Sequence, residues 1–540
     1  MRAFRFPPHR GAFDGVAVLN CAECGCLPSR SMSAMKPFFK LEVLSLCLAL
    51  GVSAGCASQS PAMAADAPAP VAHIVPLPYS MQTSPGELRI DGAVALEGGT
   101  AAPRAGRAVA ELLATLHIAT ADAATPLRLR LVDDAALGDE GYRLVVDEAI
   151  DLSARTDTGL LHAVQSLRQL LPADAWPAYR LPRVAITDVP AYRWRGLSLD
   201  VARSFLPVEY LEKHIDRMAL FKLNRLHLHL TDDQGWRIEI KRHPKLTEVG
   251  GASAVEGGHA GYYTQEQLKH LVAYAQARGV TLVPEIDMPG HVQAALASYN
   301  ELACADTRNL STYSGVEVGF SVFCLEKPEV VYPFVHDVLE EVVAIFPSNE
   351  IHIGGDEIKH PLYADFVGRA AAMVDAMGRT PIVWEEGSVA DMKPDALLQL
   401  WNDGYAIDKA VAKGHPLILS PCSYLYIDHG NYAGQPGADW CRAEGVPLKR
   451  VYSFDPTPFK TAVGVEAALW TEFVHTDAAA DDHLWPRLAA VAEVAWSPAG
   501  QRSYDGFVQR MGALRPQLDA LGIRYHAEPD LGWTDAKDAH

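Results

Sequence analysis

The chain has 540 residues, of which 49% are hydrophobic and 21% charged, which excludes a disordered protein and allows one large domain with a smaller one. Its formal net charge is -19. Nucleic-acid surfaces need clustered Lys and Arg, and no basic stripe occurs in the sequence, so we expect no nucleic-acid partner.

The amino terminus is typical of a targeting segment. Residues 1–34 are interpreted as an upstream extension from a wrongly chosen start, and residues 35–64 as a signal or lipoprotein segment. The apolar run at residues 43–54 is too short to span a bilayer. Two processing sites compete: Ser53-Ala54-Gly55-Cys56 makes Cys56 a lipidation candidate, and Ala62-Met63-Ala64 fits small-residue cleavage. We expect an exported protein, either periplasmic, outer-membrane lipoprotein or secreted, with membrane contact only through a lipid anchor.

Cysteine usage agrees with export. Of the 9 cysteines, five lie at or before Cys56. The others form two close pairs, and in an oxidising compartment we predict disulfides between Cys304 and Cys324 and between Cys422 and Cys441. Each would close a loop of about 20 residues and contribute roughly 3 kcal/mol. The alternatives are four free thiols or a zinc site, and the latter lacks close Cys-x-x-Cys pairs.

A Pro/Ala-rich linker at residues 65–72 leads into a small α+β domain at residues 73–185. Residues 127–131 and 142–146 alternate like half-buried antiparallel strands, whereas residues 108–116 and 158–171 have helical spacing. No catalytic group of residues is evident in this domain.

From residue 186 the pattern changes to short apolar strands separated by helical stretches, which indicates a parallel sheet. Eight such units predict a (β/α)8 barrel over residues 186–525, followed by a tail at residues 526–540. The predicted strands are residues 196–199, 225–230, 281–284, 350–353, 381–384, 397–400, 416–419 and 464–469.

Polar and aromatic residues follow these strands, at the end of the barrel where active sites of this fold are built. Carboxylates, an Arg and several Trp in one mouth are typical of a carbohydrate site, because indole faces stack on sugar rings and charged groups bind hydroxyls. A single Trp or His would more often belong to the core. The residues in strand order are Asp200, Arg203, His227, His229, Asp232, Asp233, Glu285, Asp287, His291, Asp356, Glu357, Trp384, Trp401, Tyr424, Tyr426, Asp428, Trp470 and Glu472.

Asp356 and Glu357 are adjacent, with Cα atoms roughly 3.8 Å apart. Two side chains from one strand end are poorly placed to flank a glycosidic bond, for which most glycosidases separate their carboxyl groups by about 5 to 9.5 Å. A substrate that supplies its own nucleophile removes the difficulty. A 2-acetamido group would attack the anomeric carbon, Glu357 would protonate the leaving oxygen, and Asp356 would orient the acetamido group.

Five ordered motifs closely resemble those of the β-N-acetylhexosaminidases of glycoside hydrolase family 20. They begin at Trp194-Arg195-Gly196, His227-Leu228-His229, Pro284-Glu285-Ile286, His352-Ile353-Gly354 and Leu469-Trp470-Thr471, and the resemblance covers about residues 77–498. It implies a non-catalytic domain before the catalytic barrel. No metal or organic cofactor is implied.

The resemblance also implies roles for single residues. Arg203 would bind the 3- and 4-hydroxyls of the terminal sugar, and Asp428 and Glu472 its 4- and 6-hydroxyls. Tyr426 would hydrogen bond the acetamido oxygen opposite Asp356. Further implied roles are an enclosing wall of Trp384, Trp401 and Trp470, and a pair that tunes Glu357, formed by Asp232 and His291. His227 and His229 are interpreted as structural.

The sequence departs from the commoner family pattern at Ser204, Glu385-Glu386 and Asn402-Asp403, and Trp440 beside Cys441 is a candidate aglycone platform. The expected protein is an exported, retaining exo-β-N-acetylhexosaminidase. Its expected substrates are chitooligosaccharides or glycans with terminal GlcNAc or GalNAc. The alternatives are a disaccharide-releasing relative, a catalytically silent sugar-binding protein, and a metal-dependent hydrolase that loses activity with chelator. The sequence does not indicate the oligomeric state.

Overall fold

The computed structural model describes residues 70–172, 178–304, 310–403, 411 and 413–533. The upstream extension, the signal or lipoprotein segment and Cys56 lie outside these residues. Within the described ranges, none of the helices is both long enough and apolar enough to cross a membrane.

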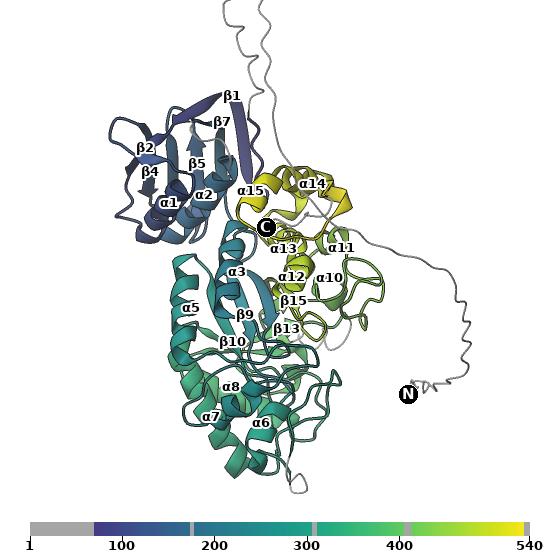
Figure 1. Cartoon of the computed structure of the whole chain (residues 1–540). Coiled ribbons are helices and arrows are strands. Elements are labelled where there is room, and N and C mark those ends of the chain that lie inside the picture. Colours follow the sequence, from purple (N-terminus) through teal and green to yellow (C-terminus); the bar gives the residue numbers. More distant parts are fainter. Residues whose placement is uncertain (1–69, 173–177, 305–309, 404–410, 412, 534–540) are drawn as a thin grey trace, which may run out of the picture. The chain divides into compact units, whose positions relative to one another are not determined.

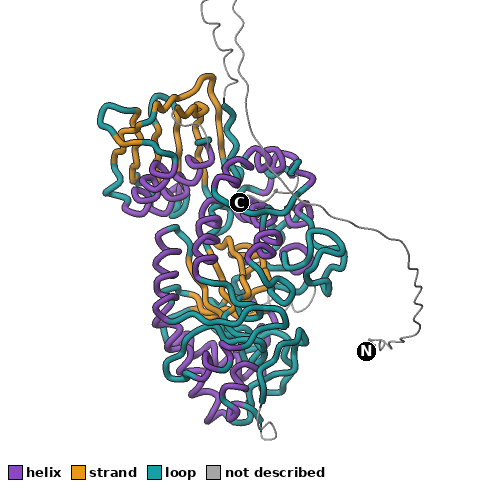
Figure 2. Tube along the Cα trace, in the orientation of Figure 1, coloured by secondary structure: helices purple, strands orange, loops and turns teal. Residues whose placement is uncertain are grey.

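The first part of the described chain is an α+β domain with one mixed sheet. The strands lie in the order β1-β7-β5-β6-β4-β2-β3, and α1 and α2 pack side by side on the sheet (Figure 2). Thr156 caps α2, because its side chain accepts a hydrogen bond from Gly159 N. The elements are β1 (Ser80–Asp91), β2 (Ala93–Glu97), α1 (Pro103–Thr115), β3 (Ala119–Thr120), β4 (Thr125–Leu131), β5 (Tyr142–Val146), β6 (Ile150–Ala154), α2 (Asp157–Leu170) and β7 (Ala178–Asp188).

The predicted strands and helices of this domain are present, but the antiparallel assignment is wrong for one strand. β5 pairs antiparallel with β6 and β7, as predicted. In contrast, β4 pairs parallel with both β2 and β6. The crossover through α1 returns the chain in the direction of β2, and sequence alternation reports which face is buried but not the direction of the partner strand.

The second part forms a closed barrel of parallel strands, which confirms the predicted (β/α)8 fold. Each predicted strand overlaps an observed one, and the helices lie outside the barrel (Figure 1). All seven residues of the first barrel strand are buried, as expected for a strand covered on both faces. In barrel order the strands are β8 (Trp194–Asp200), β9 (Arg225–His229), β10 (Thr281–Glu285), β11 (Glu350–His352), β12 (Thr380–Trp384), β13 (Leu397–Leu400), β14 (Leu417–Leu419) and β15 (Ala462–Leu469).

The helices of the barrel part differ widely in length. The longest ones follow β8, β9, β10 and β11, and shorter ones follow β14. They are α3 (Val208–Leu220), α4 (Lys245–Glu248), α5 (Gln265–Ala277), α6 (Gln293–Ser298), α7 (Pro328–Ile345), α8 (Tyr363–Ala376), α10 (Cys422–Leu425), α11 (Leu448–Tyr452), α12 (Asp477–Leu484), α13 (Arg487–Trp496), α14 (Tyr504–Ala513) and α15 (Arg515–Ala520).

A buried ion pair connects the α+β domain to the barrel. Arg195 in β8 donates from Nη1 to Glu140 Oε2 at 2.9 Å and from Nη2 to Glu140 Oε1 at 2.7 Å. Asn224 Nδ2 donates to the same Oε1 at 2.9 Å. Glu140 therefore compensates the positive charge of Arg195, whose side chain is fully buried in the barrel.

Candidate active site

The carboxyl ends of the parallel strands gather the predicted site residues at one end of the barrel. Ion pairs connect them: Arg203 approaches Asp232 and Glu472, and His291 approaches Asp232, Asp356 and Glu357. The predicted convergence of strand ends is therefore present in the structure, because closure of a parallel barrel places these ends in one ring.

The tandem acids leave β11 through two glycines with positive φ. At Gly354, φ is 67° and an added Cβ would lie 1.7 Å from Asp287 Oδ1, so no side chain fits. Gly355 N donates to the same Oδ1 at 3.1 Å. This close approach turns the chain so that the side chains of Asp356 and Glu357 both face His291, with Nε2 3.6 Å from Asp356 Oδ2 and 3.3 Å from Glu357 Oε2.

His291 lies between the tandem acids and a buried carboxylate. Its Nδ1 is 3.3 Å from Asp232 Oδ1. Burial lowers the pKa of His291, but the carboxylates of Asp232 and Asp356 outweigh burial and raise that pKa well above its usual value. The acidic groups beside its two nitrogens therefore favour the protonated form of this imidazole.

Asp356 is the more enclosed of the tandem acids. Its side chain is 16% exposed, compared with 32% for Glu357. Burial raises the pKa of Asp356 well above its usual value, and Asp287 adds to this rise while His291 opposes it. Burial also raises the pKa of Asp287 to about 7. The two tandem acids thus differ in how far each side chain is exposed, and such a difference suits different roles in general acid–base chemistry.

Aromatic side chains from several strand ends gather at the same end of the barrel. Trp384 is buried and donates from Nε1 to Glu285 Oε1 at 2.9 Å. Its ring centroid lies 6.1 Å from that of Trp470, which in turn lies 6.1 Å from Tyr426. Trp401 stacks on Tyr426 with an interplanar angle of 19°. These four rings are adjacent in space although they come from four strand ends.

Further charged side chains lie at the same end of the barrel, among them Arg203, Asp428 and Glu472. Arg203 is 4% exposed, with Nη2 2.8 Å from Asp232 Oδ2 and 3.8 Å from Glu472 Oε1. Burial raises the pKa of Glu472 to about 7 against the opposing charge of Arg203. Asp428 is buried with its Oδ2 3.4 Å from His429 Nδ1, and neither of its carboxylate oxygens has a hydrogen-bond partner among the described residues. A ligand rich in hydroxyl groups would satisfy these acceptors.

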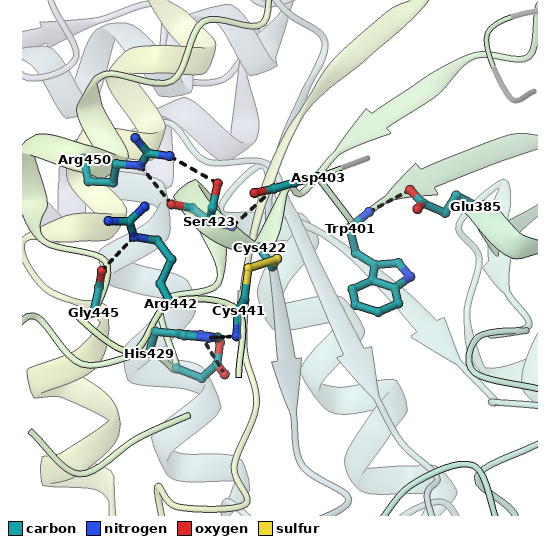
Figure 3. Close-up of a disulfide and its surroundings, with 11 residues drawn as sticks. Glu385, Trp401, Asp403, Cys422, Ser423, His429, Cys441, Arg442, Gly445 and Arg450 are labelled. Carbon is teal, nitrogen blue, oxygen red and sulfur yellow. Dashed lines mark hydrogen bonds and ion pairs between the residues drawn. A yellow bond between two sulfur atoms is a disulfide. The ribbon is translucent and has the colours of Figure 1, made fainter. Parts of the chain in front are cut away.

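Both predicted disulfides are present. Cys304 is bonded to Cys324, and Cys422 is bonded to Cys441 (Figure 3). The second disulfide lies near Trp401 and fixes the segment that carries Trp440. Trp440 is 58% exposed, and its ring centroid lies 5.7 Å from Trp401 and 5.9 Å from Tyr426. An exposed indole thus borders the aromatic wall.

Two residues named in the sequence analysis have contacts that sequence reasoning did not assign to them. His229, interpreted as structural, is buried and hydrogen bonds to Asp232 Oδ2 at 2.7 Å and to Glu285 Oε2 at 2.6 Å, so it supports the carboxylate beside His291. Glu386 accepts a hydrogen bond from the indole of Trp401, with both oxygens 3.2 Å from Nε1. The only sequence signal for Glu386 is its place two residues after a strand-end Trp.

Several groups of buried His and carboxylate side chains among the described residues are close enough to share an ion. They include His227, Glu285 and His352; His229, Asp232 and Asp287; and Asp232, Asp233 and His291. His227 Nε2 lies 3.0 Å from Glu285 Oε2, and His229 binds Asp232 directly. Ion pairs and hydrogen bonds between these side chains account for the short distances within each group.

Comparisons with known proteins agree with the site. The profile of the catalytic domain of glycosyl hydrolase family 20 matches residues 192–364 and 359–499, and that of domain 2 of this family matches residues 71–189. The β-N-acetylhexosaminidase of Cellulomonas fimi is 40% identical over 421 residues, which cover 75% of this chain and 84% of that protein.

Solved structures are similar over most of the chain. Streptomyces plicatus N-acetyl-β-hexosaminidase in complex with Thio-NAglucal has a TM-score of 0.81 and 38% identity, covering 87% of this chain and 99% of that one. The exo-β-N-acetylglucosaminidase of Vibrio harveyi in complex with N-acetylglucosamine has a TM-score of 0.75 and 30% identity, covering 86% and 80%. From the strand-end site and these matches together, the chain belongs to glycosyl hydrolase family 20 and is a β-hexosaminidase of that family.

Proposed function

We propose that this enzyme is a retaining exo-β-N-acetylhexosaminidase whose substrate supplies the nucleophile through its 2-acetamido group. The observation that carries the proposal is that Asp356 and Glu357 leave one strand end and meet at the same imidazole of His291. A protein nucleophile would need a second carboxyl group across the scissile bond from the acid. Two carboxyl groups on one side of the pocket instead suit one proton donor and one group that orients the acetamido.

In the first step, the acetamido carbonyl oxygen attacks the anomeric carbon while the bond to the glycosidic oxygen breaks. Glu357, the more exposed of the two acids, gives its proton to that leaving oxygen. Asp356 accepts the acetamido N–H and stabilises the developing positive charge, and the Tyr426 hydroxyl donates to the acetamido oxygen.

In the second step, water attacks the anomeric carbon from the face that the aglycone left. The Glu357 carboxylate takes a proton from this water, and the bond between the acetamido oxygen and the anomeric carbon breaks. Two inversions at one carbon give net retention. The His291 imidazolium beside both acids stabilises their anionic forms during the cycle.

The exo mode follows from the groups around the far end of the sugar. Arg203, Asp428 and Glu472 would bind the 3-, 4- and 6-hydroxyls of a terminal residue, so a chain extended at these positions would not fit. The exo-acting Vibrio harveyi relative supports this mode. The same contacts argue against a disaccharide-releasing enzyme, and the presence of both tandem acids argues against a silent sugar-binding protein.

The proposed substrates are chitooligosaccharides or glycans that end in GlcNAc or GalNAc. Trp440 borders the aromatic wall and is exposed, which suits stacking against the sugar that follows the scissile bond. We also propose that the protein is exported to the periplasm or as a lipoprotein, since structural disulfides persist in oxidising compartments. The mass of the mature amino terminus distinguishes lipidation at Cys56 from cleavage after Ala64, and retention of residues 35–64 would contradict export.

The experiment that tests the function compares paired aryl β-glycosides of GlcNAc and glucose. We expect kcat/KM to fall by at least about 10³-fold when the acetamido group is replaced by hydroxyl, because the nucleophile is lost. Equal cleavage of the two glycosides would reject the proposal. Incubation with a chelator is the control for a metal-dependent hydrolase, and activity should be unchanged.

A further inference from the structure

Glu386 anchors one wall of the pocket in which we place the acetamido group. It is the second residue of a short helical turn, η4 (Glu385–Val389), which begins directly after β12. Both of its carboxylate oxygens lie 3.2 Å from Trp401 Nε1. The preceding Glu385 accepts the backbone N–H of Trp401 at 3.2 Å (Figure 3). The indole of Trp401 is therefore fixed at its main chain by one acid and at its ring by the next.

The same carboxylate also lies near the tandem acids, because the charge of Asp356 adds to the rise that burial causes in the pKa of Glu386. Glu357 has φ of 57°, in the left-handed region that is unfavourable for a residue with a side chain. A backbone in this conformation persists when surrounding groups hold it. The Glu386 side chain thus binds the Trp401 indole and lies near the acid that precedes Glu357.

Charged and titratable groups face Glu386 from several strand ends. Burial and then the charge of Asp356 raise the pKa of Glu386 to about 7, while the hydrogen bond from Trp401 opposes this rise. The pKa of Tyr426 is raised mainly by burial, and the charge of Glu386 adds to this rise. The neighbouring Glu385 is buried, and burial followed by the charge of Glu386 raises its pKa to about 9. Asp356, Glu357, Tyr426 and Glu385 are therefore the titratable groups that lie around Glu386.

We propose that Glu386 is a positioning residue that sets the width of the N-acyl pocket by holding the Trp401 indole in place. The inference rests on the proposed function, because it takes the space between Trp401 and Asp356 as the acetamido site. An indole held at both ends cannot move outward to admit a longer acyl chain. Selectivity for N-acetyl over larger N-acyl groups would then depend on a carboxylate that contacts no atom of the substrate.

The test compares Glu386→Ala and Glu386→Gln with the unchanged enzyme on aryl β-glycosides that carry 2-acetamido, 2-propionamido or 2-butyramido groups. Ala removes both acceptor oxygens, so we expect kcat/KM for the acetamido substrate to fall by about 10- to 100-fold. We also expect the propionamido-to-acetamido ratio of kcat/KM to rise by roughly tenfold, the scale on which pockets discriminate one methylene. Gln keeps one acceptor oxygen, so the ratio in Glu386→Gln should lie within about threefold of that of the unchanged enzyme.

A pH profile separates the two roles of the carboxylate. Glu386→Gln removes a carboxyl group that gains its negative charge as pH rises through about 7, so the pH profile of kcat/KM should change from about pH 7 upward while the N-acyl ratio stays near that of the unchanged enzyme. The control is Glu329→Gln on the exposed first turn of α7, which should leave the ratio and the profile unchanged.

Three outcomes would overturn the inference or separate it from the proposed function. An unchanged N-acyl ratio in Glu386→Ala, or equal losses across the acyl series, would show that Glu386 does not set the pocket. Unfolding temperatures of both variants identify a general loss of folding, and Glu386→Gln remains informative if Glu386→Ala does not fold. If the unchanged enzyme cleaves 2-hydroxy glycosides as well as 2-acetamido ones, the proposed function fails. If the unchanged enzyme requires the 2-acetamido group but the variants keep its N-acyl ratio, the inference alone fails.

Discussion

At the scale of single residues, the chemistry of the site depends on neighbours rather than on residue type. Asp356 and Glu357 are adjacent in sequence, but Asp356 is enclosed and its pKa is raised by burial and by Asp287. Glu357 is twice as exposed and touches His291 through a single oxygen. Because one acid faces the interior and the other faces the mouth, they suit an orienting role and a proton-donating role respectively.

Glu357→Gln tests this division of roles. The amide cannot donate a proton to the leaving oxygen, so kcat/KM for sugar or alkyl leaving groups should fall by about 10²- to 10⁴-fold. The nitrophenolate of an activated nitrophenyl glycoside leaves without protonation, so kcat/KM for this substrate should fall far less. Steady-state kinetics on both substrate types provide the measurement. Equal losses on the two would show that Glu357 is not the proton donor.

At the scale of elements, short segments after the strands present the side chains, and covalent bonds hold two of them. The Cys422–Cys441 disulfide connects α10 to the segment of Trp440, with a sequence separation of 19. Cys304–Cys324 closes a loop of nearly equal separation, 20 residues, after β10. Because the two loops are alike in length but only one carries Trp440, they form a natural pair for comparison.

Replacing both Cys422 and Cys441 by Ser should lower the free energy of unfolding by roughly 3 kcal/mol, since a loop of this length gains that much entropy in the unfolded chain. It should also raise KM for chitooligosaccharides more than KM for an aryl monosaccharide glycoside, because the Trp440 platform becomes mobile. The matched control replaces Cys304 and Cys324 by Ser. If that control raises the oligosaccharide KM equally, Trp440 is not the platform.

At the scale of the whole molecule, the α+β domain contributes to the stability of the barrel. Glu140 from this domain pairs with Arg195, which is fully buried in β8. Although burial raises the pKa of Glu140, the guanidinium of Arg195 outweighs burial and holds that pKa far below its usual value. Removing the carboxylate would leave a buried cation without compensation, which is strongly destabilising.

Glu140→Ala should therefore lower the free energy of unfolding by about 3 kcal/mol or more at pH 7. A carboxyl group with a depressed pKa in the folded state stabilises the fold above its unfolded pKa, and this contribution is lost as pH falls. The difference between the two proteins should shrink below roughly pH 4.5. Urea unfolding followed by tryptophan fluorescence at several pH values measures this. A difference independent of pH would mean that packing, not charge, is responsible.

The sequence by itself determined the barrel, the ring of strand-end residues and both disulfides. Hydrophobic period and strand spacing report burial and connectivity, and a closed parallel barrel then brings residues such as Arg203, Glu357 and Glu472 to one mouth without further information. The cysteine pairs were readable because each is close in sequence.

Only the tertiary structure decided the contacts that depend on direction and distance. The parallel partners of β4 were missed because alternation does not encode strand direction. The link from Glu386 to Trp401 joins the ends of β12 and β13, and the contacts of His291 with two acids depend on a turn at Gly354 and Gly355. Such contacts, and the pKa shifts that follow from them, arise from burial and separations of a few ångströms that a linear pattern does not contain.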